Sequence, residues 1–522
     1  MAVPTLVSEA ADVVGGRRGS TNSVRNHGID WLLFGPAIIL LLWGLKLAAS
    51  ACYNVILHPL KRIPGPWPAK VMPFYLTSAE AKLDRAQVLL KLHRKYGSSV
   101  RIGPNEVSIG DWRLYREIYG GSVPTRKTHS YDIGNFLGHH NIFSFIDKAQ
   151  HRARRKMQSQ PYSLQAIYEN EPLIASKADV MVRRMIDLAR QPTSGGTVEA
   201  YRLCGLFSLE VILKCAFNRE YGEAIDGESW EFLQAMDEGA MSLAIRTVVP
   251  FLKPSVGRRL PGFVGHAFHQ FDKWHSMTSK LCQDFMRTES SMDKTQRFLT
   301  TPLLTNKDDY LGRKLTQGEV DEEAMGIAFA GSGTTSTTMT YLLYALSRPE
   351  GQRIQKTLRL ELNTAGETLR ELQDLPYLNA VIKETMRVFP TIISTLPRIL
   401  EAPLTINDNL VLPAGTVVGM QNLVHHQDPD LFPEPEKFLP ERWLDAKANK
   451  DMNTALTPFS IGTRNCLGQN LARAEVYLAT AKVFKRLSLT LSELMTVQDM
   501  KMDDRFNVVP HSRKLLLNVE AI

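Results

Sequence analysis

The stretch FSIGTRNCLG, which starts at Phe459, is the feature that most limits what this chain can fold into. Its glycines, Gly462 and Gly468, let the backbone turn tightly around the sulfur of Cys466 and approach a flat ligand closely. Arg464 can form a bidentate pair with a carboxylate, and Phe459 can keep water away from the sulfur. Hydrogen bonds and burial of this kind tune a thiolate that binds iron. The pattern therefore indicates haem iron ligated by Cys466, in preference to a buried structural cysteine.

A second motif, E-x-x-R, lies upstream at Glu384 and Arg387. Two charges at this spacing are neighbours on a helix, but the motif alone is weak because Glu367 and Arg370 repeat it. The context favours Glu384 and Arg387. The sequence VFP follows them directly and ends the helix at its proline, and the sequence PERW lies between this motif and the cysteine stretch.

Together these motifs resemble the cytochrome P450 superfamily of haem-thiolate monooxygenases, and the chain is similar to membrane-bound filamentous-fungal members. The resemblance implies haem b, iron protoporphyrin IX, as cofactor, with the Cys466 thiolate as axial metal ligand. It also implies that Arg442 joins Glu384 and Arg387 in a buried charge triad that fastens the loop in front of the haem. The residues that the resemblance implies for cofactor binding are Phe459, Gly462, Arg464, Cys466, Gly468, Arg398, His151 and Arg155.

The segment HRARRK, which begins at His151, has two interpretations. In the family, an aromatic residue or His and an Arg four residues later hold a haem propionate, a role that His151 and Arg155 fit. The segment is equally compatible with a solvated basic helix face. In the first case its other basic residues would dock an acidic reductase. His425 and His426 are interpreted as structural, because isolated histidines are more often core groups than ligands.

Length and composition agree with one large domain. The chain has 522 residues, 44% of them hydrophobic and 22% charged, which is enough to bury an extensive core. The 62 Lys and Arg residues exceed the 54 Asp and Glu residues by a net charge of +8. This mild excess suits an anionic membrane or an acidic electron donor and is too diffuse to indicate nucleic acid. The five cysteines contain no C-x-x-C pair, which argues against a disulfide framework and a zinc site.

The N-terminal part contains a second strong signal. Residues 31–57 are apolar except for Lys46, and a membrane span needs about 20 mostly apolar residues. A cleaved signal peptide is the alternative, but its apolar core would be shorter and nearer the start. Basic residues flank both sides equally, so the positive-inside rule does not fix the orientation. We expect a polar leader over 1–30, a transmembrane anchor over 31–57, a proline-rich elbow over 58–70 and a haem-thiolate catalytic domain over 71–522.

Between these landmarks the sequence predicts helices over 81–95, 165–190 and 203–217, where apolar residues recur every three or four positions. Residues 100–109 predict two short strands around a Pro-Asn turn, and residues 402–418 predict a second extended region with Pro-Ala-Gly as its turn. The expected fold class is mainly α with a minor β lobe, the cytochrome P450 fold, preceded by one N-terminal transmembrane helix.

A long helix is predicted to begin after Thr316, whose pairing with Glu319 is a capping box, and to end before the proline at position 349. It contains the run AGSGTTSTT, whose small and hydroxylated residues are unusual inside a helix and can bend it. In the family, Thr334 would hydrogen-bond iron-bound oxygen and help deliver protons, with Thr335 beside it. Here Gly333 stands where the family has an acid. Either ordered water, Ser332 or Thr335 replaces that carboxylate, or O–O cleavage is slower and the chemistry is shifted.

The resemblance implies a membrane-anchored monooxygenase that takes electrons from NADPH-cytochrome P450 reductase, splits O₂ and inserts one oxygen into a lipophilic small molecule. We expect a single-pass protein of the endoplasmic reticulum with a cytosolic catalytic domain, acting in fungal secondary metabolism. Two alternatives stay open: the same haem chemistry used for dehydrogenation, rearrangement or isomerisation, and a non-catalytic haem sensor. The residues expected to line the substrate pocket are Phe329, Ala330, Gly333, Thr391, Ile392, Ile393, Ser394, Thr395 and Leu396.

Overall fold

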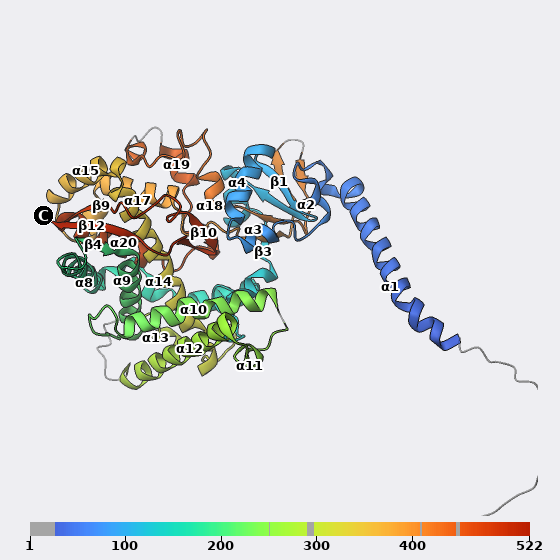
Figure 1. The fold of residues 1–522 in the computed structure, drawn as a ribbon, viewed down its shortest axis with the longest axis horizontal. Helices are drawn as coiled ribbons and strands as arrows, with labels where there is room; N and C mark the ends of the chain where they lie inside the picture. The colour runs from blue at the N-terminus through green and yellow to red at the C-terminus, as the bar shows by residue number, and fades with distance from the viewer. Residues whose placement is uncertain (1–26, 250, 290–296, 408–409, 445–448) are drawn as a thin grey trace, which may run out of the picture. The chain divides into compact units, whose positions relative to one another are not determined.

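A computed structural model describes residues 27–249, 251–289, 297–407, 410–444 and 449–522 (Figure 1). The chain forms two compact units, Met1–Leu57 and His58–Ile522. In the first unit, α1 (His27–Cys52) continues into a short π-helix, Tyr53–Leu57. The part from Pro36 to Leu57 is long and apolar enough to cross a membrane, with a mean hydropathy of 1.6. The expected leader over 1–30 lies almost entirely outside the described residues.

The second unit is mostly helical. Its centre is α14 (Gln317–Ser347), which packs against α9 (Ala200–Phe217) and α20 (Gln469–Arg486), and α20 packs against α8 (Glu171–Ala189). The other helices are α2 (Trp67–Val71), α3 (Thr77–Ala81), α4 (Arg85–Tyr96), α5 (Tyr115–Tyr119), α6 (Lys148–Gln158), α7 (Leu164–Glu169), α10 (Glu228–Val248), α11 (Pro254–Gly257), α12 (Gly262–Glu289), α13 (Thr301–Thr305), α15 (Gln352–Asn363), α16 (Leu369–Gln373), α17 (Pro376–Val388), α18 (Asn422–His425) and α19 (Asn449–Ala455).

Strands form a minor part of the second unit. A five-stranded sheet has the order β1-β2-β8-β5-β3, in which only β2 and β8 run parallel. Figure 1 shows that this lobe combines blue strands from early in the chain with orange strands from late in it. The strands of this sheet are β1 (Ser99–Gly103), β2 (Glu106–Ile109), β3 (Thr125–Lys127), β5 (Arg398–Leu400) and β8 (Val417–Gly419).

The remaining strands form smaller sheets. A three-stranded sheet has the order β4-β12-β9, and β6 pairs with β7 and β10 with β11 as antiparallel pairs. The hairpin β10–β11 lies beside α14. These strands are β4 (Thr197–Glu199), β6 (Leu404–Asn407), β7 (Leu410–Leu412), β9 (Leu487–Leu491), β10 (Met502–Arg505), β11 (Asn507–Pro510) and β12 (Leu516–Ala521).

Most predicted elements are confirmed, and one is wrong in detail. The strands predicted over 100–109 are β1 and β2, and the extended region 402–418 holds β6, β7 and the start of β8. The helix predicted over 165–190 is instead two helices, α7 and α8, that meet at Asn170. Pro172 explains the break, because it lies in the first turn of α8, where its missing N–H leaves no hydrogen bond unmade.

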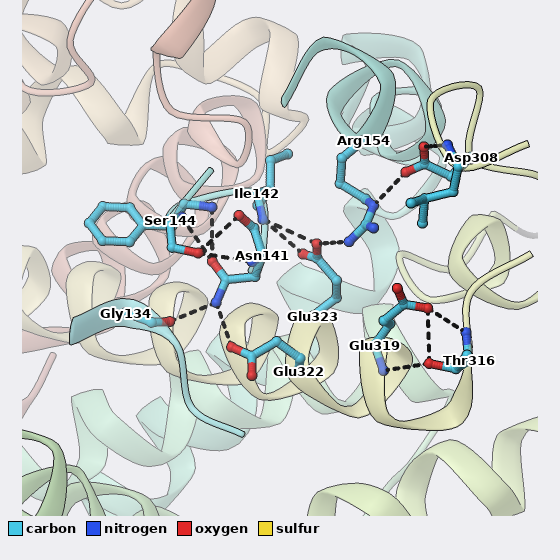
Figure 2. Close-up of polar contacts among 12 residues, drawn as sticks. Gly134, Asn141, Ile142, Ser144, Arg154, Asp308, Thr316, Glu319, Glu322 and Glu323 are labelled. Carbon is cyan, nitrogen blue, oxygen red and sulfur yellow. Dashed lines mark hydrogen bonds and ion pairs between the residues drawn. The ribbon is translucent and has the colours of Figure 1, made fainter. Parts of the chain in front are cut away.

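The long predicted helix is confirmed as α14, and its first turns organise the loop next to it. Thr316 and Glu319 form the expected capping box. One turn later, Glu322 accepts hydrogen bonds from the backbone N–H groups of residues 136 and 137 and, at 2.7 Å, from Asn141 Nδ2. Glu323 accepts from the N–H of Ile142 at 3.1 Å. Figure 2 shows that these carboxylates fix the segment from Gly134 to Ser144 against the helix.

The side chain of Arg154, on α6, completes this network. Its Nε donates to Asp308 at 2.9 Å and its Nη1 to Glu323 at 2.5 Å, as Figure 2 shows. All three side chains are buried. The network therefore joins α6, α14 and the segment before α14 through charges that are buried from solvent.

Replacing this arginine tests the network. Arg154→Ala should lower the free energy of unfolding by about 3–5 kcal/mol, because two buried carboxylates lose their cation. Denaturant unfolding of the purified protein measures the change. Lys156→Ala on the same helix is the matched control, since its pair with Asp309 at 2.8 Å is exposed and should contribute little. Equal effects of the two substitutions would contradict this account.

Candidate active site

Cys466 lies in a loop whose shape depends on one glycine. Gly462 has a φ of +74°, and a Cβ there would lie 2.2 Å from the carbonyl oxygen of Tyr119, so only glycine fits. The Cys466 N–H donates to Phe459 O at 2.9 Å, which closes the loop. Gly468 follows at the start of α20. The conformation of the loop is thus determined by its own backbone and by α5.

Protein atoms surround the Cys466 thiol, but they do not cover it. Desolvation raises the pKa of Cys466, while a hydrogen bond from the Gly468 backbone and the charge of Arg155 oppose that rise. The Cys466 side chain nevertheless remains accessible. Arg155 is held in place because its Nη1 donates to Asn465 O at 2.7 Å and its Nη2 to Asn465 Oδ1 at 2.5 Å. An accessible sulfur with two thiolate-stabilising groups is suited to binding a metal.

Several cationic side chains lie close enough to one another near this loop to lower each other's pKa. Desolvation and the neighbouring charge of Arg398 lower the pKa of Arg464 to about 10. Desolvation, Arg398 and Arg464 hold the pKa of Lys127 well below its usual value. Desolvation, with Arg464 and Lys127, lowers the pKa of His151 to about 3. Within the described ranges, neither Arg398, Arg464 nor Lys127 makes an ion pair with a carboxylate.

Each cation instead donates to an uncharged oxygen. Arg464 Nη1 donates to Phe145 O at 2.6 Å, and Arg398 Nη1 donates to the hydroxyl of Tyr131 at 2.5 Å. Lys127 donates to a backbone carbonyl oxygen of the same loop region. These cations, two buried and one half-buried, repel one another and would be stabilised by a dianion. The donor set therefore fits the two propionates of haem, with Cys466 available to its iron.

The sequence did not predict Lys127 and Tyr131 as members of this cluster. Lys127 and Arg398 are directly opposite each other in the antiparallel pairing of β3 with β5. Like charges at opposed positions of a sheet repel, so the pairing is unfavourable unless an anion lies between them. No local motif marks Lys127, because its neighbour comes from a strand far along the chain.

The central turns of α14 present Thr334 but not Thr335. Ala330 is exposed although it lies mid-helix, and Thr334 and Gly333 are half-buried, so this face is open. The Thr334 hydroxyl donates to Ala330 O at 2.9 Å. Thr335 is buried in the core with only 3% of its surface exposed. The structure therefore groups Thr334 with Ala330 and Gly333 and places Thr335 on the other side of the helix.

The expected pocket residues of the segment 391–396 also differ in how deeply they are buried. The Thr391 hydroxyl lies 2.9 Å from that of Thr338 on α14, and Leu396 O accepts a hydrogen bond from Tyr119 at 2.8 Å. Ile393 is fully buried in the main core. The others are half-buried, namely Thr391, Ile392, Ser394, Thr395 and Leu396. Phe329 packs against aromatic rings of the core.

Glu384 and Arg387 form a fully buried pair on α17. The Nη2 and Nε atoms of Arg387 donate to the carboxylate of Glu384 at 2.8 and 2.9 Å. Arg442 Nε and Trp443 Nε1 donate to the same carboxylate at 3.1 and 2.9 Å. Glu367 instead contacts Lys482 at 2.7 Å, and the guanidinium of Arg370 lies over an aromatic ring.

Arg387 also binds three carbonyl oxygens of the chain between α18 and the 3₁₀ turn Pro440–Trp443. They belong to His426, Pro435 and Lys437, at 2.9, 2.7 and 3.0 Å. His425 and His426 are fully buried, and His425 Nε2 lies 3.0 Å from Thr457 Oγ1. Their positions suit a structural role. The carboxylate of Glu384 and the guanidinium of Arg387 thereby fix the segment that leads to the cysteine loop.

Removing Arg387 tests the importance of this pair. Arg387→Ala leaves the buried carboxylate of Glu384 without its main partner, which costs about 3–5 kcal/mol. We expect a protein that no longer incorporates haem, measured as haem bound per mole of purified chain. Arg370→Ala, at the second E-x-x-R motif, is the control and should keep its haem because Arg370 is exposed. A full haem load in Arg387→Ala would refute this role.

Comparison of this chain with known proteins identifies one family. The family model described as Cytochrome P450 matches residues 64–519. The chain is 29% identical over 516 residues to the cytochrome P450 monooxygenase cypX of Dothistroma septosporum, covering 94% of this chain and 99% of that protein. It is 30% identical over 503 residues to the N-acetyltryptophan 6-hydroxylase ivoC of Emericella nidulans, covering 91% and 94%.

The fold is similar to that of a solved structure as well. The retinoic-acid-bound cyanobacterial CYP120A1 superposes with a TM-score of 0.70 at 19% identity, covering 88% of this chain and 99% of that one. The helical body and the small strand lobe thus have the family's fold. The chain belongs to the cytochrome P450 family and is a monooxygenase of that family.

Proposed function

We propose that this P450 binds haem b through Cys466 and oxidises a lipophilic small molecule of fungal secondary metabolism. Electrons would come from NADPH-cytochrome P450 reductase and oxygen from O₂. The observation that carries the proposal is the accessible Cys466 thiol near a group of cations that, among the described residues, form no ion pair with a carboxylate. The name of one relative, N-acetyltryptophan 6-hydroxylase, supports hydroxylation of a small organic molecule.

Haem, when bound, supplies the iron that activates O₂ and transfers one oxygen atom to the substrate. Arg155 and the Gly468 N–H stabilise the negative charge of the Cys466 thiolate. Arg398, Arg464 and Lys127 would bind the haem propionates.

The residues that we propose to handle oxygen and substrate lie on α14 and next to it. The Thr334 hydroxyl donates a hydrogen bond to Ala330 O, so its oxygen lone pairs can accept a hydrogen bond from a water and hold that water on the open face of the helix. The aromatic rings of Phe329, Phe136 and Trp274 pack together and exclude water from one side of this helix. The half-buried residues of the segment 391–396 would orient the substrate.

A basic stripe supports an acidic redox partner. Lys148, Arg152 and Lys156 are exposed at successive four-residue intervals, which places them on one face of α6. The same helix carries Arg155, which reaches the cysteine loop. An acidic reductase that docks on this face would therefore lie near the thiolate side of the site.

The assignment of the iron ligand is tested by Cys466→Ser. A hydroxyl is a poor ligand where a soft thiolate is needed, so the thiolate-type carbon monoxide spectrum should disappear together with substrate-dependent NADPH oxidation. The measurement is the reduced carbon monoxide difference spectrum of the haem-loaded protein. Cys282→Ser, at a buried cysteine of α12, is the control and should keep the spectrum. If Cys466→Ser kept it, the ligand would be elsewhere.

The membrane anchor is tested by deletion of residues 1–57. We propose that α1 holds the protein in the endoplasmic reticulum membrane with the catalytic unit in the cytosol. The deletion should move the protein, wholly or in part, from the membrane pellet to the soluble fraction, because the apolar span is gone. Its carbon monoxide spectrum should persist. A full-length protein that is soluble without detergent would contradict the proposal.

A further inference from the structure

The cysteine loop begins with a tight turn that contains a strained residue. The N–H of Ser460 donates to the carbonyl oxygen of Thr457 at 3.0 Å, which closes a turn with Pro458 at its second position. Ser460 has a φ of +55°, a left-handed conformation that is unfavourable for a residue with a side chain. Phe459, inside this turn, accepts the Cys466 N–H at 2.9 Å. A change in the turn would therefore move the backbone next to Cys466.

Helix α18 supports this turn through the side chain of Thr457. Thr457 is buried, with 4% of its surface exposed. Its Oγ1 donates to Asn422 Oδ1 at 3.0 Å and lies 3.0 Å from His425 Nε2. Asn422 Nδ2 in turn donates to Ile392 O at 3.3 Å. One hydroxyl group thus links the start of the cysteine loop, α18 and the segment 391–396, which come from separate parts of the chain.

The direction of each hydrogen bond in this chain of contacts follows from its last member. A carbonyl oxygen can only accept, so the amide nitrogen of Asn422 must face Ile392 O and the amide oxygen must face Thr457. The Thr457 hydroxyl therefore gives its single proton to Asn422 and accepts the bond from His425. Burial lowers the pKa of His425 to about 3, so its imidazole is neutral at neutral pH and carries its proton on Nε2.

The turn is attached through its backbone as well as through the hydroxyl. The Thr457 N–H donates to His426 Nε2 at 3.4 Å, and this bond survives in any variant that keeps the N–H. Asn422 and His425 are buried, so each bond lost there leaves a polar group away from water. Loss of the hydroxyl therefore breaks two buried bonds at once but keeps the backbone bond, so the turn loosens without detaching.

We propose that Thr457 is a positioning residue whose hydroxyl holds the cysteine loop in a fixed place relative to the substrate-side segment 391–396. By fixing the turn that contains Phe459, it keeps the backbone at Cys466 in the conformation that binds iron. This inference rests on the proposed function, because it concerns the iron ligand and the pocket of the same site. It deepens that function by naming a residue that acts on Cys466 only through others.

Thr457→Val tests the proposal in the haem-loaded protein, because valine has nearly the same shape and lacks the hydroxyl. The first measurement is the rate at which the reduced carbon monoxide complex loses its thiolate-type spectrum at a fixed temperature. We expect a loss about fivefold faster than in the wild type, the factor that corresponds to one net hydrogen bond. The second measurement is hydrogen exchange of the peptide 457–466, in which the Ser460 and Cys466 amides should lose protection by a similar factor.

Two further variants serve as controls. Thr457→Ser keeps the hydroxyl and should keep both wild-type rates. Thr278→Val removes a fully buried hydroxyl from α12, where Thr278 Oγ1 donates to Trp274 O at 2.9 Å. A purely structural role of Thr457 would lower the thermal unfolding temperature without a specific effect on the cysteine loop. Each variant is therefore compared at the same interval below its own unfolding temperature, where Thr278→Val should behave like the wild type.

His425→Phe provides a second variant in case Thr457→Val fails to bind haem. A phenyl ring keeps the packing against Tyr115, whose ring centroid lies 5.4 Å from that of His425, but it has no N–H to donate. His425→Phe should also speed the loss of the spectrum, whereas His425→Gln, which places an amide N–H near the position of Nε2, should not. The double variant with Thr457→Val should be no worse than Thr457→Val alone, because both remove one shared bond.

The link to the segment 391–396 has its own measurement. Imidazole reaches haem iron with little contact to the pocket walls, whereas phenylimidazole must also fit between them. Asn422→Leu removes the donor to Ile392 O and should weaken phenylimidazole about fivefold relative to imidazole, as read from the optical difference spectrum. An unchanged ratio of the two affinities would overturn the link to this segment.

The outcomes separate this inference from the proposed function. If the wild type shows no thiolate-type carbon monoxide spectrum, the proposed function fails. If that spectrum is normal but Thr457→Val and His425→Phe lose it no faster than Thr278→Val, the positioning role of Thr457 is overturned and the proposed function stands.

Discussion

The structure around the site depends on the carboxylate of Glu384. This one buried group accepts hydrogen bonds from Arg387, Arg442, Trp443 and the backbone of Leu439. Arg387 extends the effect by binding three backbone carbonyls of the segment that follows α18. A buried charge is tolerated only when every partner is in place, so these segments are fixed together or not at all. The cysteine loop comes later in the chain, after α19.

A second constraint is electrostatic, and it opposes folding instead of stabilising the fold. Lys127, Arg398 and Arg464 are brought close together by sheet pairing and by the cysteine loop, and their mutual repulsion opposes folding. The Glu384 network is satisfied by the protein alone, whereas in the described part of the chain no carboxylate forms an ion pair with this cluster. The fold thus contains one internally balanced charge group that builds the scaffold and one unbalanced group suited to an anionic cofactor.

Helix α14 has different roles along its length. Its first turns use Glu322 and Glu323 to hold the loop 134–144, while its middle turns omit bulky side chains at Ala330 and Gly333. The loop and the hairpin β10–β11 approach the helix from different parts of the chain. Residues such as Asn507 therefore meet α14 only in the folded state.

The sequence by itself determined the elements whose cause is local. The capping box at Thr316, the strands on either side of the Pro-Asn turn and the end of α17 before Pro390 depend on neighbouring residues, and each is present as predicted. The break at Asn170 was missed because regular apolar spacing outweighed the signal of Pro172. The cysteine loop and the E-x-x-R pair were predictable because each is a short motif with a distinctive context.

Only the tertiary structure decided which residues share a face. Thr334 and Thr335 are adjacent in sequence, yet a helix turns by about 100° per residue, and the packing of α14 buries one and leaves the other half-exposed. Lys127 joins Arg398 through strand pairing, and Asn507 reaches Gly333 through a hairpin near the end of the chain. Contacts of this kind carry no local sequence signal, because they depend on how distant segments pack rather than on the residues beside them.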